Sequence, residues 1–311
     1  MTDLRLARRE VRVRAPGKVN LSLRVGPRDI DGYHRLGTVF QAVSVYEEVT
    51  ARPAEAIRLT VSGPAADHVP LGEDNLALRA ARLLAAHTGT DEGVHLRVTK
   101  AVPVAGGMAG GSADAAAALL ACDAFWGTGL PREELAELAG SLGADVPFLL
   151  SGQTAVGTGR GDVLTPALSR GEYHWAFGIR ADGLSTPRVF EEFDRATPDP
   201  PVPDLGSEVP LLQALRAGDP GAVGALLHND LHDAAVELCP DLVETLAVAE
   251  DAGALGVVIS GSGPTVAALG RSRQHALALA AAMTAAGVVD SVLTASGPVH
   301  GARVLAGSDG L

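Results

Sequence analysis

Alternating apolar and polar positions predict strands in the first 100 residues of the chain. The run "VRVRAPGKVNLSLRV" (11–25) is β-branched on both sides of a Pro-Gly pair, where we expect a strand, a turn and a second strand. Two more β-rich runs lie in 38–51 and 56–62. Apolar residues at helical spacing predict a helix in 72–89, and the run 93–102 predicts a strand that leads into a glycine-rich segment.

Two helices are expected after the glycine-rich segment. In the run 112–127, rich in alanine, Ser112 is the expected N-cap and Gly127 the expected stop. A second helix is expected from Pro131 to Gly143.

The pattern changes after about residue 160. We expect a strand at 173–179, a loop at 184–194, and an exposed excursion in the Pro- and Asp-rich stretch 197–209. Helices dominate from 210 to 253, and the chain closes with strand, helix and strand patterns between 256 and 297. This mixture indicates an α+β fold of two domains, which we place at 1–163 and 164–311.

Charge and composition exclude several classes of function. The chain of 311 residues has a formal net charge of -12, which argues against a nucleic-acid surface. Apolar runs are too short to span a bilayer, and the basic N-terminus lacks the apolar stretch of a secretory signal. We therefore expect a cytoplasmic protein that binds neither membrane nor nucleic acid.

Lysine is rare, which makes its two positions conspicuous. Lysine occurs only at Lys18 and Lys100, so nearly all of the 25 basic Lys and Arg residues are arginine. Lys100 has no evident role in the sequence. Lys18 stands in a strand pattern, where a solvated lysine is the ordinary alternative to a functional one.

The segment "PVAGGMAGGSADA" (103–115) has the features of an anion site. A strand, a glycine-rich turn and a helix present backbone N–H groups and a helix dipole to one point, and four glycines (106, 107, 110 and 111) allow positive φ or close approach. The spacing is not GxxxxGK[ST] and fits GxGxxG poorly. A tight turn needed only for packing remains the alternative.

Three segments together resemble the motifs of the GHMP small-molecule kinases: "PGKVNLSL" (16–23), the glycine-rich segment, and "SGSGPTVAAL" (260–269). Further runs, "DGYH" (31–34), "LGADVPF" (142–148) and "HNDL" (228–231), resemble the branch of that superfamily that phosphorylates 4-diphosphocytidyl-2-C-methyl-D-erythritol.

The resemblance implies the two-domain GHMP kinase fold, with an N-terminal ribosomal protein S5 domain 2-like part and a C-terminal ferredoxin-like part. It also implies ATP as a substrate that arrives with Mg²⁺, for which no protein ligand is assigned, and small-molecule substrates. We expect a monomer or a homodimer. The implied ATP-binding residues are Pro103, Val104, Ala105, Gly106, Gly107, Met108, Ala109, Gly110, Gly111, Ser112 and Ala113.

The resemblance also implies a catalytic pair. Asp145 would orient and deprotonate the acceptor hydroxyl as a general base, and Lys18 would lie beside it and supply the positive charge that the glycine loop lacks. Without the resemblance, Asp145 reads equally well as a turn or helix-terminus residue.

Residues for the substrate follow from the same resemblance. Tyr33 would stack on the cytosine, Phe190 would cover its other face, and His34 would bond its polar edge. Asn20 and Thr186 would contact the substrate as well.

Three rival functions fit the sequence less well, each because of a feature that is present or missing. Another GHMP kinase, such as homoserine or mevalonate kinase, would share the phosphate motifs but not "DGYH" and "LGADVPF". An inactive GHMP fold would have lost the lysine or the aspartate. A nicotinamide-dependent dehydrogenase would need an acidic residue after a fitting GxGxxG.

Overall fold

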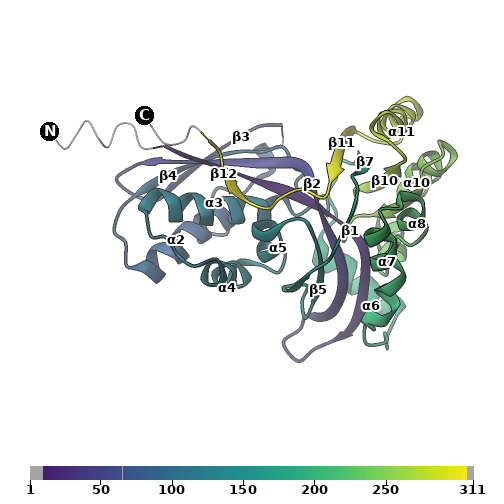
Figure 1. Cartoon of the computed structure of the whole chain (residues 1–311), viewed down its shortest axis with the longest axis horizontal. Coiled ribbons are helices and arrows are strands. Elements are labelled where there is room, and N and C mark those ends of the chain that lie inside the picture. The colour runs from purple at the N-terminus through teal and green to yellow at the C-terminus, as the bar shows by residue number, and fades with distance from the viewer. Residues whose placement is uncertain (1–9, 65, 307–311) are drawn as a thin grey trace.

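The computed structural model describes residues 10–64 and 66–306, which form two sheets flanked by helices. The basic N-terminus, for which no secretory signal is predicted, lies outside them up to residue 9. Strands β1 (Val11–Arg28) and β2 (His34–Pro53) form a long antiparallel hairpin that runs from one half of the molecule into the other (Figure 1). The first sheet has the order β12-β1-β2-β4-β3, with β5 beside β2, β6 beside β5, and β8 beside β1. These further strands are β3 (Arg58–Ser62), β4 (Val94–Thr99), β5 (Thr154–Thr158), β6 (Val163–Pro166), β8 (His228–Asn229) and β12 (Arg303–Val304).

The expected turn at Pro16 and Gly17 is wrong, because the chain continues through it as one strand. The pairing register between β1 and β2 shifts between Pro16 and Gly17. Pro16 has no backbone N–H to donate to β2, and the irregular pairing accommodates it. Gly17 approaches the glycine-rich segment closely: a Cβ there would lie 3.4 Å from the carbonyl oxygen of Met108. The backbone N–H of Lys18 then donates to the carbonyl oxygen of Met108 at 3.2 Å.

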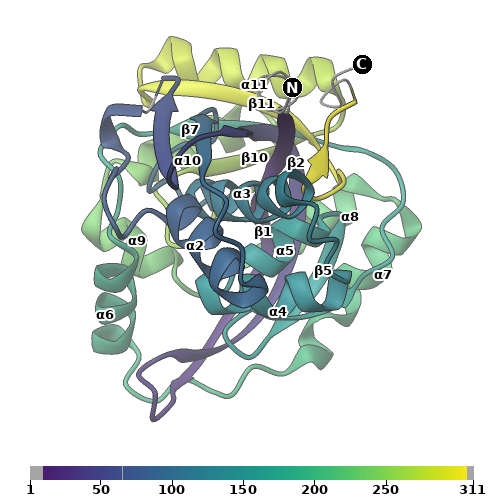
Figure 2. The same cartoon turned by 90° about the vertical axis from the view of Figure 1, so that its left-hand side faces the viewer.

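Helices cover one face of the first sheet (Figure 2). The core between them and the sheet is rich in alanine. They are α2 (Leu76–Thr88), α3 (Gly110–Trp126), α4 (Arg132–Leu142) and α5 (Val146–Ser151). Helix α3 is buried along most of its length, and its alanines let it lie close to β1 and β2. The predicted helix ends at Gly127 and Gly143 are confirmed.

The second sheet has the order β11-β7-β10-β9 with antiparallel pairing throughout. Its strands are β7 (Tyr173–Ile179), β9 (Gly256–Ile259), β10 (Val266–Gly270) and β11 (Ser291–Gly297). The helices of this half are α6 (Thr186–Ala196), α7 (Val209–Ala217), α8 (Pro220–Ala225), α9 (His232–Leu238), α10 (Leu242–Asp251) and α11 (Arg273–Ala286). A β-α-β-β-α-β order with this arrangement is ferredoxin-like, as expected.

Two expectations in the second half of the chain are corrected. The segment 184–194, expected as a loop, is largely helix α6, with a proline in its first turn. The excursion 197–209 is not wholly exposed, because Pro203 packs against the hairpin where Gly26 and Gly37 leave room for it. The domain boundary at residue 163 stays a prediction; β8 and β12, from the later part of the chain, both pair with β1 of the first sheet.

Candidate functional site

The glycine-rich segment is an irregular loop between β4 and α3, and it holds the residues proposed for ATP. Ala105, Gly107 and Ala109 have positive φ angles of 51°, 75° and 60°. Two alanines in a region that favours glycine indicate that contacts around the loop fix its shape. Of the four glycines singled out in the sequence, Gly107 has a positive φ, whereas Gly106 is needed because a Cβ would lie 2.9 Å from Thr265 Oγ1.

Helix α3 begins at Gly110, so its N-terminus faces the loop. The expected N-cap at Ser112 is wrong, because Ser112 lies inside the first turn and Ala109 occupies the cap position in the left-handed conformation. The first intrahelical bond runs from Ala113 N–H to the carbonyl oxygen of Ala109. The amides of 110–112 therefore lie at the positive end of a 17-residue helix, where an anion is favoured.

A second loop, 260–265 between β9 and β10, lies directly against the glycine-rich loop. Ser260 Oγ donates to the carbonyl oxygen of Gly107 at 3.0 Å. A Cβ on Gly107 would overlap the carbonyl oxygen of Ser260. Two motifs far apart in the sequence thus meet backbone to backbone, with no room for a side chain at Gly107.

Lys18 is buried where these two loops meet β1. Its side chain is 4% exposed, and Nζ donates to Asn20 Oδ1 at 2.5 Å and to the carbonyl oxygen of Gly107 at 2.8 Å. A Cβ on Gly261 would lie 3.0 Å from this nitrogen. Burial lowers the pKa of the Lys18 ammonium, and the negative charge of Asp145 opposes that shift.

Asp145 stands at the N-cap position of α5 but does not act as a cap. Its φ and ψ are -79° and -17°, and its side chain makes no capping hydrogen bond. The residue is half-buried, and its charge acts on Lys18. The carboxylate is thus not used to terminate the helix, which was the structural alternative for this residue.

Asn20 is fixed beside Lys18 and is 2% exposed. Its Nδ2 donates to Thr38 Oγ1 at 2.9 Å, and that hydroxyl donates to the carbonyl oxygen of Ser22 at 2.7 Å. The amide therefore has a defined orientation, with its oxygen toward the ammonium of Lys18.

Tyr33 and His34 lie at the tip of the β1–β2 hairpin, as the "DG" turn predicts. Tyr33 is 58% exposed, and its backbone N–H donates to Asp31 Oδ1. The ring of His34 stacks on Phe190, with centroids 5.1 Å apart and planes 25° apart. A cavity of about 460 Å³ is lined by Tyr33 and His34 together with parts of 158–162 and 202–205.

The side chain of His34 already faces protein groups. It is buried; Nδ1 lies 2.8 Å from the carbonyl oxygen of Gly26, and Nε2 lies 3.2 Å from Asp194 Oδ1. Nδ1 is therefore occupied, whereas the buried Nε2 has no hydrogen-bond partner among the described residues. Phe190 lies against His34 here, whereas the sequence argument pairs it with Tyr33 around the base.

Thr186 links α6 to the second loop. The residue is exposed, and its Oγ1 lies 2.8 Å from Ser262 Oγ. This hydroxyl pair brings the substrate residue expected at position 186 to the same loop that touches Gly107 and Lys18.

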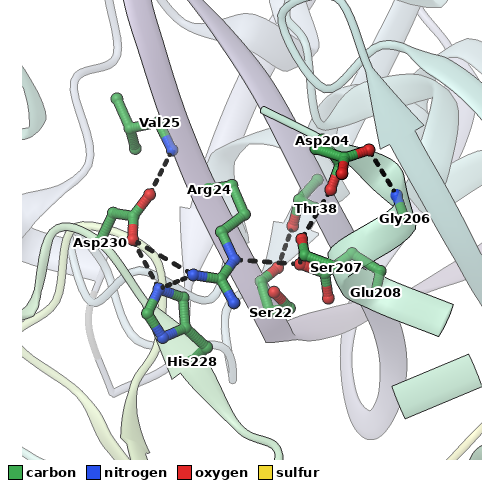
Figure 3. A network of polar contacts seen from close by, with 10 residues as sticks. All are labelled: Ser22, Arg24, Val25, Thr38, Asp204, Gly206, Ser207, Glu208, His228 and Asp230. Carbon is green, nitrogen blue, oxygen red and sulfur yellow. Dashed lines mark hydrogen bonds and ion pairs between the residues drawn. The ribbon is translucent and has the colours of Figure 1, made fainter. Parts of the chain in front are cut away.

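The "HNDL" segment ties β1 to the second loop. Asn229 Nδ2 donates to the carbonyl oxygens of Ile259 and Gly261, both at 2.7 Å. Figure 3 shows the neighbouring contacts: Asp230 accepts from the backbone N–H of Val25, and Arg24 bridges Glu208 and His228. No catalytic role was assigned to this segment from the sequence, and its contacts are structural, because they hold β1 and the second loop together.

Lys100 is the residue that sequence reasoning missed. It is not a lysine without a role on the surface: it is 2% exposed and lies between the carboxylates of Glu47 and Asp114. The only hint in the sequence is its place directly before the glycine-rich loop.

Within residues 10–64 and 66–306, no group of three or more His, Cys, Asp or Glu side chains is placed to hold a metal ion. In the same ranges, no helix has the length and apolar character needed to cross a bilayer.

Comparison with known proteins matches both halves of the chain to family models. The N-terminal domain model of the GHMP kinases matches residues 75–153, and the C-terminal model matches 211–289. A 4-diphosphocytidyl-2-C-methyl-D-erythritol kinase of Thermobifida fusca is 54% identical over 95% of this chain and 98% of its own length. A protein of the same name from Mycolicibacterium smegmatis is 50% identical over 95% of this chain and 92% of its own length.

Solved structures of kinases also resemble this chain. A crystal structure of 4-(cytidine 5'-diphospho)-2C-methyl-D-erythritol kinase aligns with a TM-score of 0.74 and 32% identity, covering 92% of this chain and 98% of that one. Homoserine kinase from Cytophaga hutchinsonii aligns with a TM-score of 0.75 at 20% identity, over 96% of this chain and 98% of that one. The second likeness shows the shared fold alone.

Proposed function

We propose, for a chain that belongs to the GHMP kinases and among them to the 4-diphosphocytidyl-2-C-methyl-D-erythritol kinases, that it transfers the γ-phosphoryl group of ATP to the 2-hydroxyl of 4-diphosphocytidyl-2-C-methyl-D-erythritol. This reaction belongs to isoprenoid precursor synthesis by the methylerythritol phosphate pathway. The observation that supports it most directly is Lys18, a buried ammonium bonded to the glycine-rich loop and within the electrostatic reach of Asp145.

The proposed chemistry uses few groups. The loop 103–113 and the N-terminus of α3 bind the triphosphate through backbone N–H groups. Asp145 orients the 2-hydroxyl and accepts its proton as the oxygen attacks phosphorus. Lys18, which is bonded to the loop and acted on by the charge of Asp145, stabilises the negative charge of the transferring group.

For the second substrate, we propose that Tyr33 stacks on the cytosine, which its exposure permits. Phe190 on α6 and His34 on the hairpin form a stacked pair, and His34 bonds the base edge through Nε2, which has no hydrogen-bond partner in the described part of the chain. Asn20, bonded to Lys18, contacts the substrate from β1, and Thr186, bonded to Ser262 of the second loop, contacts it from α6.

ATP in a phosphoryl transfer arrives as its Mg²⁺ complex, so we include Mg²⁺ in the proposal. The ion would neutralise part of the phosphate charge during the transfer. We propose further that the enzyme works in the cytoplasm, as a monomer or a homodimer.

The test is an ADP-release assay with 4-diphosphocytidyl-2-C-methyl-D-erythritol, homoserine and mevalonate offered side by side. We expect turnover with the cytidylyl substrate alone. Turnover only with homoserine or mevalonate would replace the proposed substrate by the alternative within the same superfamily.

A further inference from the structure

Three charged side chains form a buried cluster beneath the glycine-rich loop. Lys100 Nζ lies 2.6 Å from Glu47 Oε1 and 2.7 Å from Asp114 Oδ2. The three residues are exposed by 2%, 0% and 4%, respectively. They come from the end of β4, from β2, and from α3.

The cluster holds both ends of the loop. The carboxylate of Glu47 accepts the backbone N–H groups of Ala101 at 3.0 Å and Val102 at 3.2 Å, where the loop begins. Asp114 lies one turn into α3, which begins at Gly110, where the loop ends. Lys100 joins these two carboxylates, so the start of the loop and the start of the helix are fixed to one ammonium.

Burial of these three charged groups costs desolvation free energy, which a group with only a packing role would not require. Two carboxylates share one ammonium, and Asp114 Oδ1 has no hydrogen-bond partner. Desolvation raises the pKa of Glu47 to about 7 and that of Asp114 to about 6. Apolar residues of similar volume usually stabilise a core as well as a buried ion pair does. What the charged residues provide in addition is directional contacts to specific backbone groups.

We propose that Glu47, Lys100 and Asp114 are positioning residues for nucleotide binding, which set the path of the loop from 103 to 109 between β4 and α3. The inference rests on the proposed function, because the loop matters only if it binds the phosphates of ATP. The cluster acts through the loop backbone and touches no substrate.

The experiment compares four variants. Glu47→Gln removes an acceptor from an amide at the loop entrance, and Glu48→Gln is its control, because Glu48 is an exposed neighbour paired with Arg12. Asp114→Ala removes the tie to α3 in a helix rich in alanine, where alanine folds well, and Asp114→Asn restores an acceptor for Lys100. Steady-state kinetics for both substrates and thermal shift with added ATP are measured for each variant.

We expect Glu47→Gln and Asp114→Ala to raise the KM for ATP about tenfold, with kcat and the KM of the second substrate changed less than threefold. Asp114→Asn and Glu48→Gln should stay within about twofold of wild type. Wild-type KM for ATP in Asp114→Ala, or equal losses for both substrates and kcat, overturns the inference even if Glu47→Gln does not fold. Failure of the wild type to bind ATP would instead count against the proposed function.

Discussion

Lys18 lies at the point where β1, the glycine-rich loop and the loop 260–265 meet. It bonds the first loop twice, through its backbone N–H to Met108 and through Nζ to Gly107. Desolvation of a buried ammonium costs free energy, and the acceptors on Asn20 and Gly107 with the charge of Asp145 offset that cost. The position therefore constrains the shape of the cation as well as its charge.

Lys18→Arg keeps the charge but places a planar fork where a compact ammonium fits. The groups around Nζ leave little room, so we expect the catalytic geometry to shift by roughly 1 Å and kcat to fall about 100-fold. Arg12→Lys on the same strand is the control, since its side chain is 49% exposed. Equal kcat values for the two variants would remove Lys18 from the catalytic pair.

Asp145→Asn removes the proposed general base with almost no change of shape. Because the side chain does not cap α5, we expect normal folding and ATP affinity, with kcat lower by about 10² to 10⁴-fold. Asp241→Asn is a matched control, because Asp241 also stands at an N-cap position without capping. Retention of more than about half of the wild-type kcat in Asp145→Asn would assign the proton to another acceptor.

The two lysines show what the sequence reveals about single residues. Lys18 could be singled out from its motif, and the structure bonds it to the glycine-rich loop and subjects it to the charge of Asp145, while its catalytic role stays a prediction. The burial of Lys100 was not predicted, since it depends on Glu47 in another strand and Asp114 in a helix. Local sequence around Lys100 looks like the end of an ordinary strand, so only tertiary contacts distinguish it.

At the scale of elements, the site depends on irregular backbone between regular segments. The register shift at Pro16 and Gly17 brings β1 against the glycine-rich loop, and Gly107 brings that loop against Ser260. Sequence reasoning read Pro-Gly as a turn because it could not know that β2 pairs along the whole length of β1. It missed α6 because "STP" reads as a loop although proline suits the first turn of a helix.

Gly107→Ala tests the contact between the two loops. The added methyl group would overlap the carbonyl oxygen of Ser260, so we expect a loss of several °C in Tm and a raised KM for ATP. Gly129→Ala is the control, because Gly129 has a φ of 61° with open space around it and carries only the conformational cost of about 1 kcal/mol. Equal losses in both variants would mean that φ, and not the contact, requires glycine at 107.

At the scale of the whole molecule, the two sheets are joined by segments that return to the first sheet. Strands β8 and β12 both pair with β1, and hydrophobic residues of β1 and β2 pack against Trp175 and Phe177 of the second sheet. The ferredoxin-like order was predictable from the resemblance. The pairing of β8 and β12 with β1 was not, because strands of two residues leave no periodic signal in the sequence.

The buried carboxylates predict a pH dependence of global stability. The folded pKa of Glu47, about 7, is raised above its ordinary value of 4.5, so within that window the folded protein keeps a proton that the unfolded chain has released. Stability from this cluster therefore falls as the pH rises from about 5 to 7. Asp114→Asn removes a like charge that raises the pKa of Glu47, so the stability of this variant should fall less steeply than that of wild type over this window. Urea unfolding of both proteins at about pH 5.5, 6.5 and 7.5 measures it; parallel curves would contradict it.

The central claim is phosphoryl transfer to the 2-hydroxyl of 4-diphosphocytidyl-2-C-methyl-D-erythritol. That hydroxyl stands on a carbon that also bears a methyl group and no hydrogen, so a phosphate placed there has no proton on the carbon to which its ester oxygen is bound. The most direct measurement is a proton-coupled phosphorus NMR spectrum of the product formed with ATP. We expect a new phosphomonoester singlet that appears with ADP; a signal split by neighbouring carbinol protons, or no monoester at all, would contradict phosphorylation of the 2-hydroxyl.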